Sequence, residues 1–110
     1  MNKVSTQRKK RSRFEIIHDV LMQCQNGAKK TWIMYGSNLS YDLTTNYLNE
    51  LMKRGFIENR DGMYYLTESG KKLLDLLSTY IAKKKELDAI MKQIKEQFTE
   101  TPAEVHAATN

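Results

Sequence analysis

The sequence predicts a mainly α-helical fold with one small β-hairpin, and three observations lead to this expectation. Apolar residues recur at intervals of three and four in the first half of the chain, which is typical of short amphipathic helices. An Asp61-Gly62 pair separates two β-rich runs, which is a strong signal for a two-residue hairpin. A longer apolar stripe in the second half predicts a helix that needs a partner helix. Together these features predict a winged helix-turn-helix followed by a long C-terminal helix that forms an antiparallel coiled-coil dimer.

Length and charge limit the organisation and the partners. A chain of 110 residues accommodates one small domain and an extension. We expect a flexible basic arm at 1–11, a winged helix-turn-helix domain at 12–70, a coiled-coil dimerisation helix at 71–98 and a disordered tail at 99–110. The net charge of +5 favours a polyanionic partner, with nucleic acid first. No apolar run is long enough to span a bilayer and only one cysteine is present, so we expect no membrane partner and a cytoplasmic, nucleoid-associated location.

The first predicted helix begins after Ser12, because Ser12 and Glu15 have the spacing of a capping box. Gly27 is expected to end it. Its apolar face is predicted to consist of Phe14, Ile17, Val20, Leu21 and Cys24.

Two further helices are predicted to form the helix-turn-helix. The second helix is expected to be capped by Thr31 and broken at residues 36–38, with Leu39 buried after it. Ser40 is expected to cap the third helix, and Gly55 to end it. The predicted buried face of this third helix is Leu43, Tyr47, Leu48, Leu51 and Met52. Two helices joined by a short turn that contains Gly are typical of the motif.

The predicted hairpin is formed by residues 56–60 and 63–66. A two-residue turn fixes a register in which Ile57 lies opposite Leu66. Thr67 is then placed to cap the last helix.

The last helix is expected to extend to about Phe98 and to carry a heptad seam. The seam residues are Leu73, Leu77, Tyr80, Lys84, Leu87, Met91, Ile94 and Phe98. In a parallel dimer Lys84 would face its own copy, whereas in an antiparallel dimer it faces Leu87 while its amine reaches water. The antiparallel register also places Leu73 opposite Phe98, and every seam position then has an apolar partner. We therefore expect an antiparallel dimer.

Two alternatives to this dimer remain open. The helix could fold back on its own domain, because Leu74, Leu76 and Ile81 widen the apolar stripe near its start. A parallel dimer would gain a contact between Lys83 and Asp88, but an exposed pair contributes only about 0.2–1 kcal/mol.

The sequence contains no constellation that an enzyme requires. His18 and His106 have no companions at metal-ligand spacing, and neither a Gly-rich phosphate loop nor a nucleophile motif is present. Cys24 lies on an apolar stripe and is expected to pack rather than react. We therefore expect no catalytic residues, no metal site and no cofactor, and infer no small-molecule ligand.

The exposed face of the third helix is the best candidate for a DNA-reading surface. Asn can pair with adenine edges, Thr can contact a thymine methyl group, and Lys or Arg can reach phosphates. Lys29 and Lys30 begin a helix, where backbone N–H groups also attract phosphate. Arg60 lies at the wing tip next to Asp61, whose charge would oppose a phosphate. The predicted DNA-binding residues are Arg8, Lys9, Lys10, Arg11, Arg13, Lys29, Lys30, Tyr41, Thr44, Thr45, Asn46, Asn49, Lys53, Arg54 and Arg60.

Two stretches carry a family resemblance: KTWIMYGSNLSY at residues 30–41 and YLTESG at residues 65–70. Both resemble the small basic archaeal winged-helix DNA-binding proteins of the crenarchaeal 10a class. The resemblance covers about residues 12–98 and implies a winged helix, an antiparallel coiled-coil dimer and binding of double-stranded DNA in chromatin organisation or regulation. It assigns no role to the basic arm, which is longer than in that class, or to the additional tail.

The functional prediction is a homodimer that binds double-stranded DNA, largely through phosphate contacts. Any sequence preference should come from Thr45, Asn46 and Asn49. One alternative is a site-specific transcription repressor, and another is a winged-helix scaffold that binds protein instead of DNA. Salt-dependent affinity for random duplex separates binding from scaffolding, and a specificity ratio separates a repressor from a chromatin protein.

Overall fold

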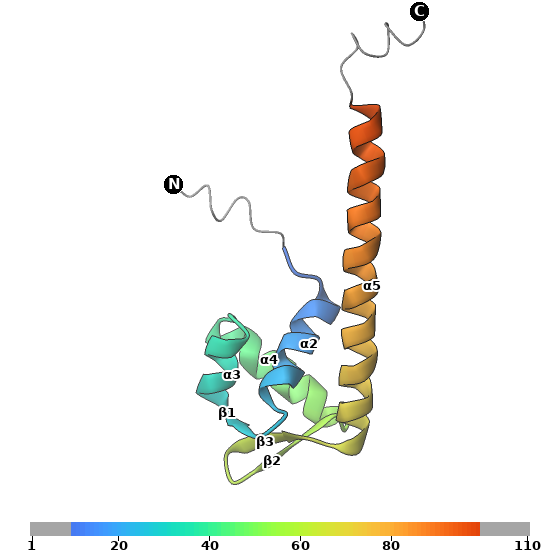
Figure 1. Ribbon diagram of the computed structural model, residues 1–110. Helices are drawn as coiled ribbons and strands as arrows, with labels where there is room; N and C mark the ends of the chain where they lie inside the picture. Colours follow the sequence, from blue (N-terminus) through green and yellow to red (C-terminus); the bar gives the residue numbers. More distant parts are fainter. Residues whose placement is uncertain (1–9, 100–110) are drawn as a thin grey trace, which may run out of the picture. The chain divides into compact units, whose positions relative to one another are not determined.

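The computed structural model describes residues 10–99 in two compact units (Figure 1). The first unit extends to Ser78 and is called the head, and the C-terminal unit begins at Thr79. The elements in chain order are α2 (Arg13–Gln23), β1 (Ala28–Lys29), α3 (Lys30–Gly36), α4 (Tyr41–Lys53), β2 (Ile57–Arg60), β3 (Met63–Leu66) and α5 (Glu68–Phe98). Helices α2, α3 and α4 pack together beside the small sheet, which confirms the predicted fold class of the head.

Helix α2 begins with the predicted capping box. The Ser12 hydroxyl accepts a hydrogen bond from the Glu15 backbone N–H, and the Glu15 carboxylate accepts one from the Ser12 N–H at 2.7 Å. The buried residues of α2 are Ile17, Val20 and Leu21. Phe14 was predicted on this buried face, but its side chain is 52% exposed because it lies in the first turn, at the edge of the core. Gly27 follows in the left-handed region with φ of 84°.

The helix-turn-helix differs from the prediction in the cap of α3 and in the residue that is buried in the first turn of α4. The N-cap of α3 is Lys29, with no side-chain cap bond, so Thr31 lies inside the helix instead of capping it. Ser40 caps α4 as predicted, because its hydroxyl accepts from the Leu43 N–H at 3.1 Å. Leu43 is exposed, whereas Thr44 is fully buried and takes the core position at this level of the helix. The Thr44 hydroxyl donates to the Ser40 carbonyl at 2.8 Å, so its burial leaves no unpaired polar group.

The sheet has three strands in the order β1-β3-β2, and its first strand was not predicted. The hairpin of β2 and β3 has the expected register, with Ile57 opposite Leu66. The Asp61-Gly62 turn has positive φ at both residues, 51° and 87°, as a type I′ turn requires. Strand β1 has only two residues, which is too short for an alternating pattern, and it pairs Lys29 with Met63.

The start of α5 completes the core of the head. Thr67 caps this helix as predicted: its hydroxyl accepts from the Gly70 N–H at 3.1 Å and donates to the Gly55 carbonyl at 2.6 Å. Leu74 and Leu77 are buried in the main hydrophobic cluster. Leu77 was expected in an open seam, but it is only 6% exposed because this part of α5 packs on its own domain.

The C-terminal unit is the remainder of α5, which ends at Phe98 as predicted. Its exposed large apolar side chains are Tyr80, Leu87, Ile90, Met91, Ile94 and Phe98. Lys84, at the polar seam position, lies 3.9 Å from the Asp88 carboxylate. Between residues 10 and 99, no helix is long and apolar enough to cross a lipid bilayer. The predicted tail from residue 100 and most of the predicted arm lie outside the described residues.

Gly70 is a position where the fold excludes a side chain. A Cβ atom there would lie 1.9 Å from the Phe56 carbonyl oxygen, which is backbone and cannot rotate away. We expect Gly70→Ala to lower the free energy of unfolding by about 1–3 kcal/mol, as measured by urea denaturation followed by circular dichroism.

Gly36→Ala is the matched control for this substitution. Its added Cβ meets only the far end of the flexible Gln23 side chain, and alanine is the better helix former. Equal unfolding free energies for the Gly70 variant and the wild type would show that α5 does not need this close approach.

Candidate nucleic-acid interface

Helix α4 presents one polar face. Asp42, Asn46, Asn49 and Lys53 are all exposed, and their spacings of four, three and four place them on the same side of the helix. Thr45 is half-buried, and its hydroxyl donates to the Tyr41 carbonyl at 3.1 Å. This bond leaves Thr45 its methyl group and acceptor lone pairs for any outside partner.

Thr44 does not belong to this face, and its prediction as a DNA contact is wrong. Its side chain has no exposed surface because it packs beneath α4 among the core residues. The error arose because Leu43 was predicted on the buried face of this helix. That assignment shifts the expected exposed face by one residue.

A cation–π contact joins the starts of α3 and α4. The Lys30 ammonium lies 3.8 Å from the centre of the Tyr41 ring, which is itself exposed. Lys29 is the preceding residue, and it is exposed without an ion pair to another described residue. Lys30 therefore lies beside the first turn of α4, and Lys29 precedes it in β1.

The sheet register continues this basic surface to the wing. Met63 of β3 lies opposite Arg60 on one side and opposite Lys29 on the other. Residues directly opposite each other in a sheet point to the same face, and adjacent strands are about 4.8 Å apart. Lys29 and Arg60 therefore share one face of the sheet, about 10 Å apart across β3.

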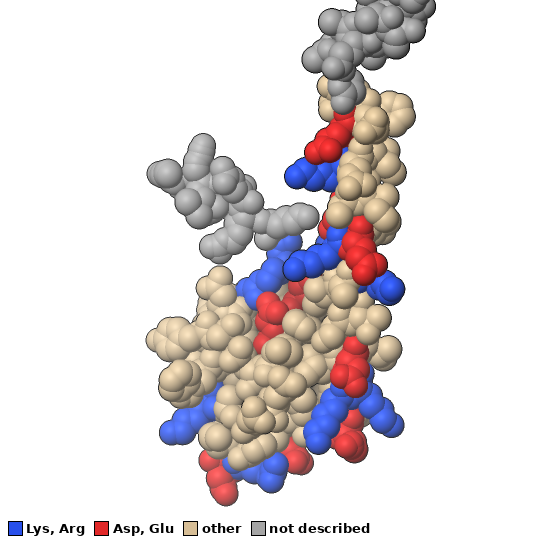
Figure 2. Space-filling view, in the orientation of Figure 1, with Lys and Arg blue, Asp and Glu red and all other residues tan. Residues whose placement is uncertain are grey.

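Arg60 is held against the wing by two neighbours. Its guanidinium lies 3.9 Å from the centre of the Tyr65 ring and 3.3 Å from the Glu58 carboxylate. On the face that Figure 2 shows, the described Lys and Arg side chains are interspersed with Asp and Glu. The charge of Arg60 is therefore partly balanced by Glu58.

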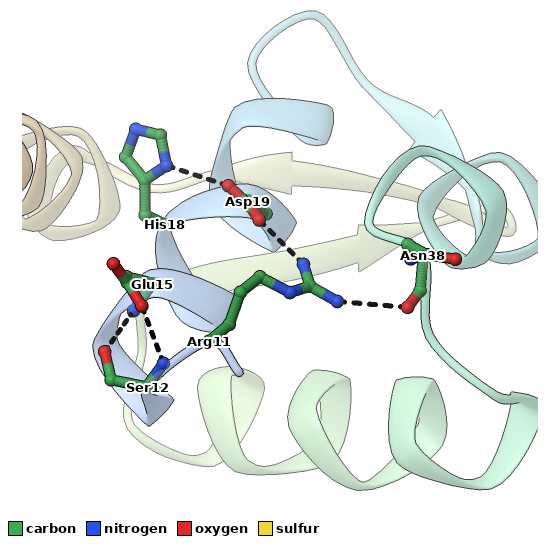
Figure 3. Close-up of polar contacts among 6 residues, drawn as sticks. All are labelled: Arg11, Ser12, Glu15, His18, Asp19 and Asn38. Atoms are coloured by element: carbon green, nitrogen blue, oxygen red, sulfur yellow. Dashed lines mark hydrogen bonds and ion pairs between the residues drawn. The ribbon is translucent and has the colours of Figure 1, made fainter. Parts of the chain in front are cut away.

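Arg11 is a structural residue. Its guanidinium bonds the Asp19 carboxylate at 2.7 Å and the Asn38 carbonyl at 3.0 Å (Figure 3). Asn38 belongs to the turn before α4, and Asp19 also contacts His18. Arg11 therefore ties the start of α2 to the helix-turn-helix and is not available as a phosphate ligand in this arrangement. Of the other arm residues predicted to bind DNA, Lys10 is exposed, and Arg8 and Lys9 lie outside the described residues.

Glu50 organises two further arginines, and the sequence prediction did not include it. Its carboxylate accepts hydrogen bonds from Arg13 and, at 3.1 Å, from Arg54. The hydrogen bond from Arg13, aided by that from Arg54, lowers the pKa of Glu50. The spacing of Glu50 and Arg54 by four residues was a sequence signal for one of these pairs. The other joins α2 to α4 and depends on tertiary structure.

Cys24 is buried in the core of the head. Burial raises the pKa of the Cys24 thiol to about 12, so this cysteine stays protonated and packs as a small apolar residue. Between residues 10 and 99, no cluster of His, Cys, Asp or Glu is placed to hold a metal ion.

The sequence matches a family described as Winged helix-turn-helix over residues 10–85. The chain belongs to the winged helix-turn-helix family. An uncharacterised protein of Methanocaldococcus jannaschii is 40% identical over 77 residues, which span 69% of this chain and 79% of that protein.

Solved structures show the same winged helix. Sso10a-2, a DNA-binding protein from Sulfolobus solfataricus, superposes with a TM-score of 0.72 at 27% identity, covering 79% of this chain and 96% of that chain. MepR, a transcription regulator of the Staphylococcus aureus efflux pump MepA, has a TM-score of 0.55 at 14% identity, covering 99% of this chain and 86% of that chain. At 14% identity, the similarity to MepR shows a shared fold only.

The lowered pKa of Glu50 predicts a pH-dependent contribution to stability. A carboxyl group with a lowered folded-state pKa stabilises the fold above its ordinary pKa, and that contribution disappears as the pH falls through the lowered value. We expect Glu50→Gln to melt at a lower temperature than the wild type at pH 7, and the difference to shrink toward zero in acid.

Thermal melts across this pH range measure the difference, with Glu86→Gln as the control in the C-terminal unit. A melting-temperature difference between Glu50→Gln and the wild type that stays constant from neutral pH to acid would contradict the role given to the Glu50 carboxylate.

Proposed function

We propose that this winged-helix protein is a homodimer that binds double-stranded DNA and acts in chromatin organisation or transcription regulation. The polar face of α4 enters the major groove, where Asn46 and Asn49 meet base edges. Lys53, at the far end of the same face, contacts a phosphate. The start of α3 and the wing contact the backbone on either side.

The observation that carries this proposal is a set of three cationic side chains that leads from the wing to α4. It runs from Arg60 across β3 to Lys29 and Lys30, and the contact of Lys30 with Tyr41 joins it to α4. A helix face with Asn and Lys next to such a set combines base readout with phosphate binding. Arg11, Arg13 and Arg54 are left out of the proposed surface because other contacts in the head already use their guanidinium groups.

The comparisons support DNA binding as the function. Sso10a-2 is a DNA-binding protein whose whole length this chain nearly covers, and the M. jannaschii relative is also archaeal. They agree with the resemblance of residues 30–41 and 65–70 to the 10a class. A nucleoid-associated location follows from DNA binding, and the net charge of +5 fits a protein that binds DNA of many sequences.

The dimer is proposed from the exposed apolar row of the C-terminal unit. Leu87, Met91, Ile94 and Phe98 repeat at the heptad spacing and are all exposed in the single chain. An exposed row of this length is typical of an interaction surface. The antiparallel order is preferred because it places Lys84 opposite an apolar residue instead of opposite a second lysine.

Lys53→Ala tests the DNA-binding face. The loss of one phosphate contact should weaken binding to all duplexes alike and reduce the slope of log K against log salt by about 0.9. Fluorescence anisotropy with random-sequence duplex at several salt concentrations measures both quantities.

Lys85→Ala removes the same charge from the C-terminal unit and should leave the salt slope unchanged. Equal salt slopes for the Lys53 variant and the wild type would remove α4 from the DNA interface. If the wild type has no salt-dependent affinity for random duplex, the protein is a scaffold and not a DNA-binding module.

Leu87→Asp tests the seam. The substitution places a charge at the centre of an apolar interface, so sedimentation equilibrium should show a monomer where the wild type is a dimer. Ala82→Asp adds the same charge at an exposed heptad position outside the seam and should remain dimeric. A wild-type chain that sediments as a monomer at micromolar concentration would refute the dimer.

A further inference from the structure

A groove in the head lies next to the first seam residues. It has a volume of about 320 Å³ and is formed by α2, the end of α4 and the first turns of α5. Phe14, Phe56, Leu73 and Leu77 supply most of its apolar wall. A cavity of about 150 Å³ already admits a benzene ring, so the groove has room for an aromatic side chain.

The seam and the groove share two residues. Leu73 and Leu77 line the groove, and both occupy seam positions in the heptad pattern. In the antiparallel register Leu73 lies opposite Phe98 of a second copy, and by the same symmetry Leu77 lies opposite its Ile94. The register thus brings the last turn of α5 of the second copy to the mouth of the groove.

Phe98 has the exposure expected of a side chain that is covered by a partner. It is 85% exposed, the largest value among the large apolar side chains in the described part of the chain. A phenylalanine buries about 150–250 Å² when it is enclosed, and such anchors dominate interfaces when they fill a pocket.

The charges at the groove also suit the end of a helix. Arg13 and Arg54 border it together with Glu50, so two guanidinium groups face one carboxylate. The C-terminal end of a helix carries about half a negative charge. The excess positive charge at the rim therefore attracts the end of α5 from a second copy.

We infer that Phe98 of a second copy inserts into this groove, so that each head holds the end of the other chain's α5. The inference rests on the antiparallel dimer proposed above and gives it an anchor at each end. It also leaves Leu73 a role in the dimer: this side chain is only half-buried in the head, and its remaining surface is the floor on which the second chain's helix ends.

Phe98→Ala tests the anchor energetically. A dimer has two such sites, and a loss of about tenfold at each raises the dimer dissociation constant about a hundredfold in sedimentation equilibrium. Gln97→Ala changes the neighbouring exposed residue and should alter the constant by less than about threefold. A dissociation constant for Phe98→Ala equal to that of the wild type would overturn the anchor.

A disulfide test separates groove insertion from seam pairing. Phe14 lines the groove from α2 and is not a seam residue, so Phe14→Cys combined with Phe98→Cys should give a covalent dimer under mild oxidation. Met22→Cys combined with Phe98→Cys is the control, because Met22 is exposed on the same helix but does not line the groove. Native Cys24 is fully buried and can be replaced by Ala in every variant.

The outcomes distinguish this inference from the proposed function. A 14–98 link between chains supports it, whereas a link that leaves the mass of a monomer, or a link between the two copies of residue 98, overturns it. Linking of a Leu73→Cys, Phe98→Cys pair without linking of the 14–98 pair keeps the antiparallel dimer and rejects the anchor. Fluorescence anisotropy with duplex DNA measures DNA binding by the same samples. If the anchor is lost while DNA binding stays intact, the DNA-binding proposal is unaffected.

Discussion

The head depends on one close backbone approach at the start of α5. Gly70 lies against the carbonyl of Phe56, which also accepts a hydrogen bond from the Thr67 N–H at 3.1 Å. Only a residue without a side chain allows α5 to enter the head at this point. From there Leu74 and Leu77 reach the core, so a domain this small fills its interior with the first turns of its long C-terminal helix.

A short chain of hydrogen bonds joins the same contact to α4, which carries the proposed DNA-binding face. The Gly55 carbonyl, just after α4, accepts hydrogen bonds from the Thr67 and Ser69 hydroxyls. The end of α4 and the start of α5 are therefore joined directly, and Glu50 holds Arg54 and Arg13 one turn earlier. The orientation of α4 within the head consequently depends on where α5 begins.

The features that the sequence predicted well were those specified by neighbouring residues. The capping box at Ser12, the caps at Ser40 and Thr67, and the hairpin at Asp61-Gly62 are local chemistry and were confirmed. Strand β1 was missed because two residues have no periodicity and exist only through pairing with β3.

The site was harder to predict because burial and ion pairs between residues far apart in the sequence determine which side chains are available. Thr44 and Leu43 exchange roles because a threonine that bonds the backbone can fill a core position, which polarity alone does not reveal. Arg11 and Arg13 were assigned to DNA on charge, whereas in the structure their guanidinium groups pair with Asp19 and Glu50. The third-helix face at Asn46, Asn49 and Lys53 stays a prediction, since exposure and spacing support it without testing it.

The central claim is that α4 and the wing of each head meet the DNA while the C-terminal unit pairs with a second chain. Titrating ¹⁵N-labelled protein with random-sequence duplex and following the backbone amide signals tests it most directly. The account predicts shifts at Lys29, Asn46, Asn49 and Arg60, with signals from residues 79–98 unchanged. Shifts confined to residues 79–98, with α4 and the wing unaffected, would contradict it.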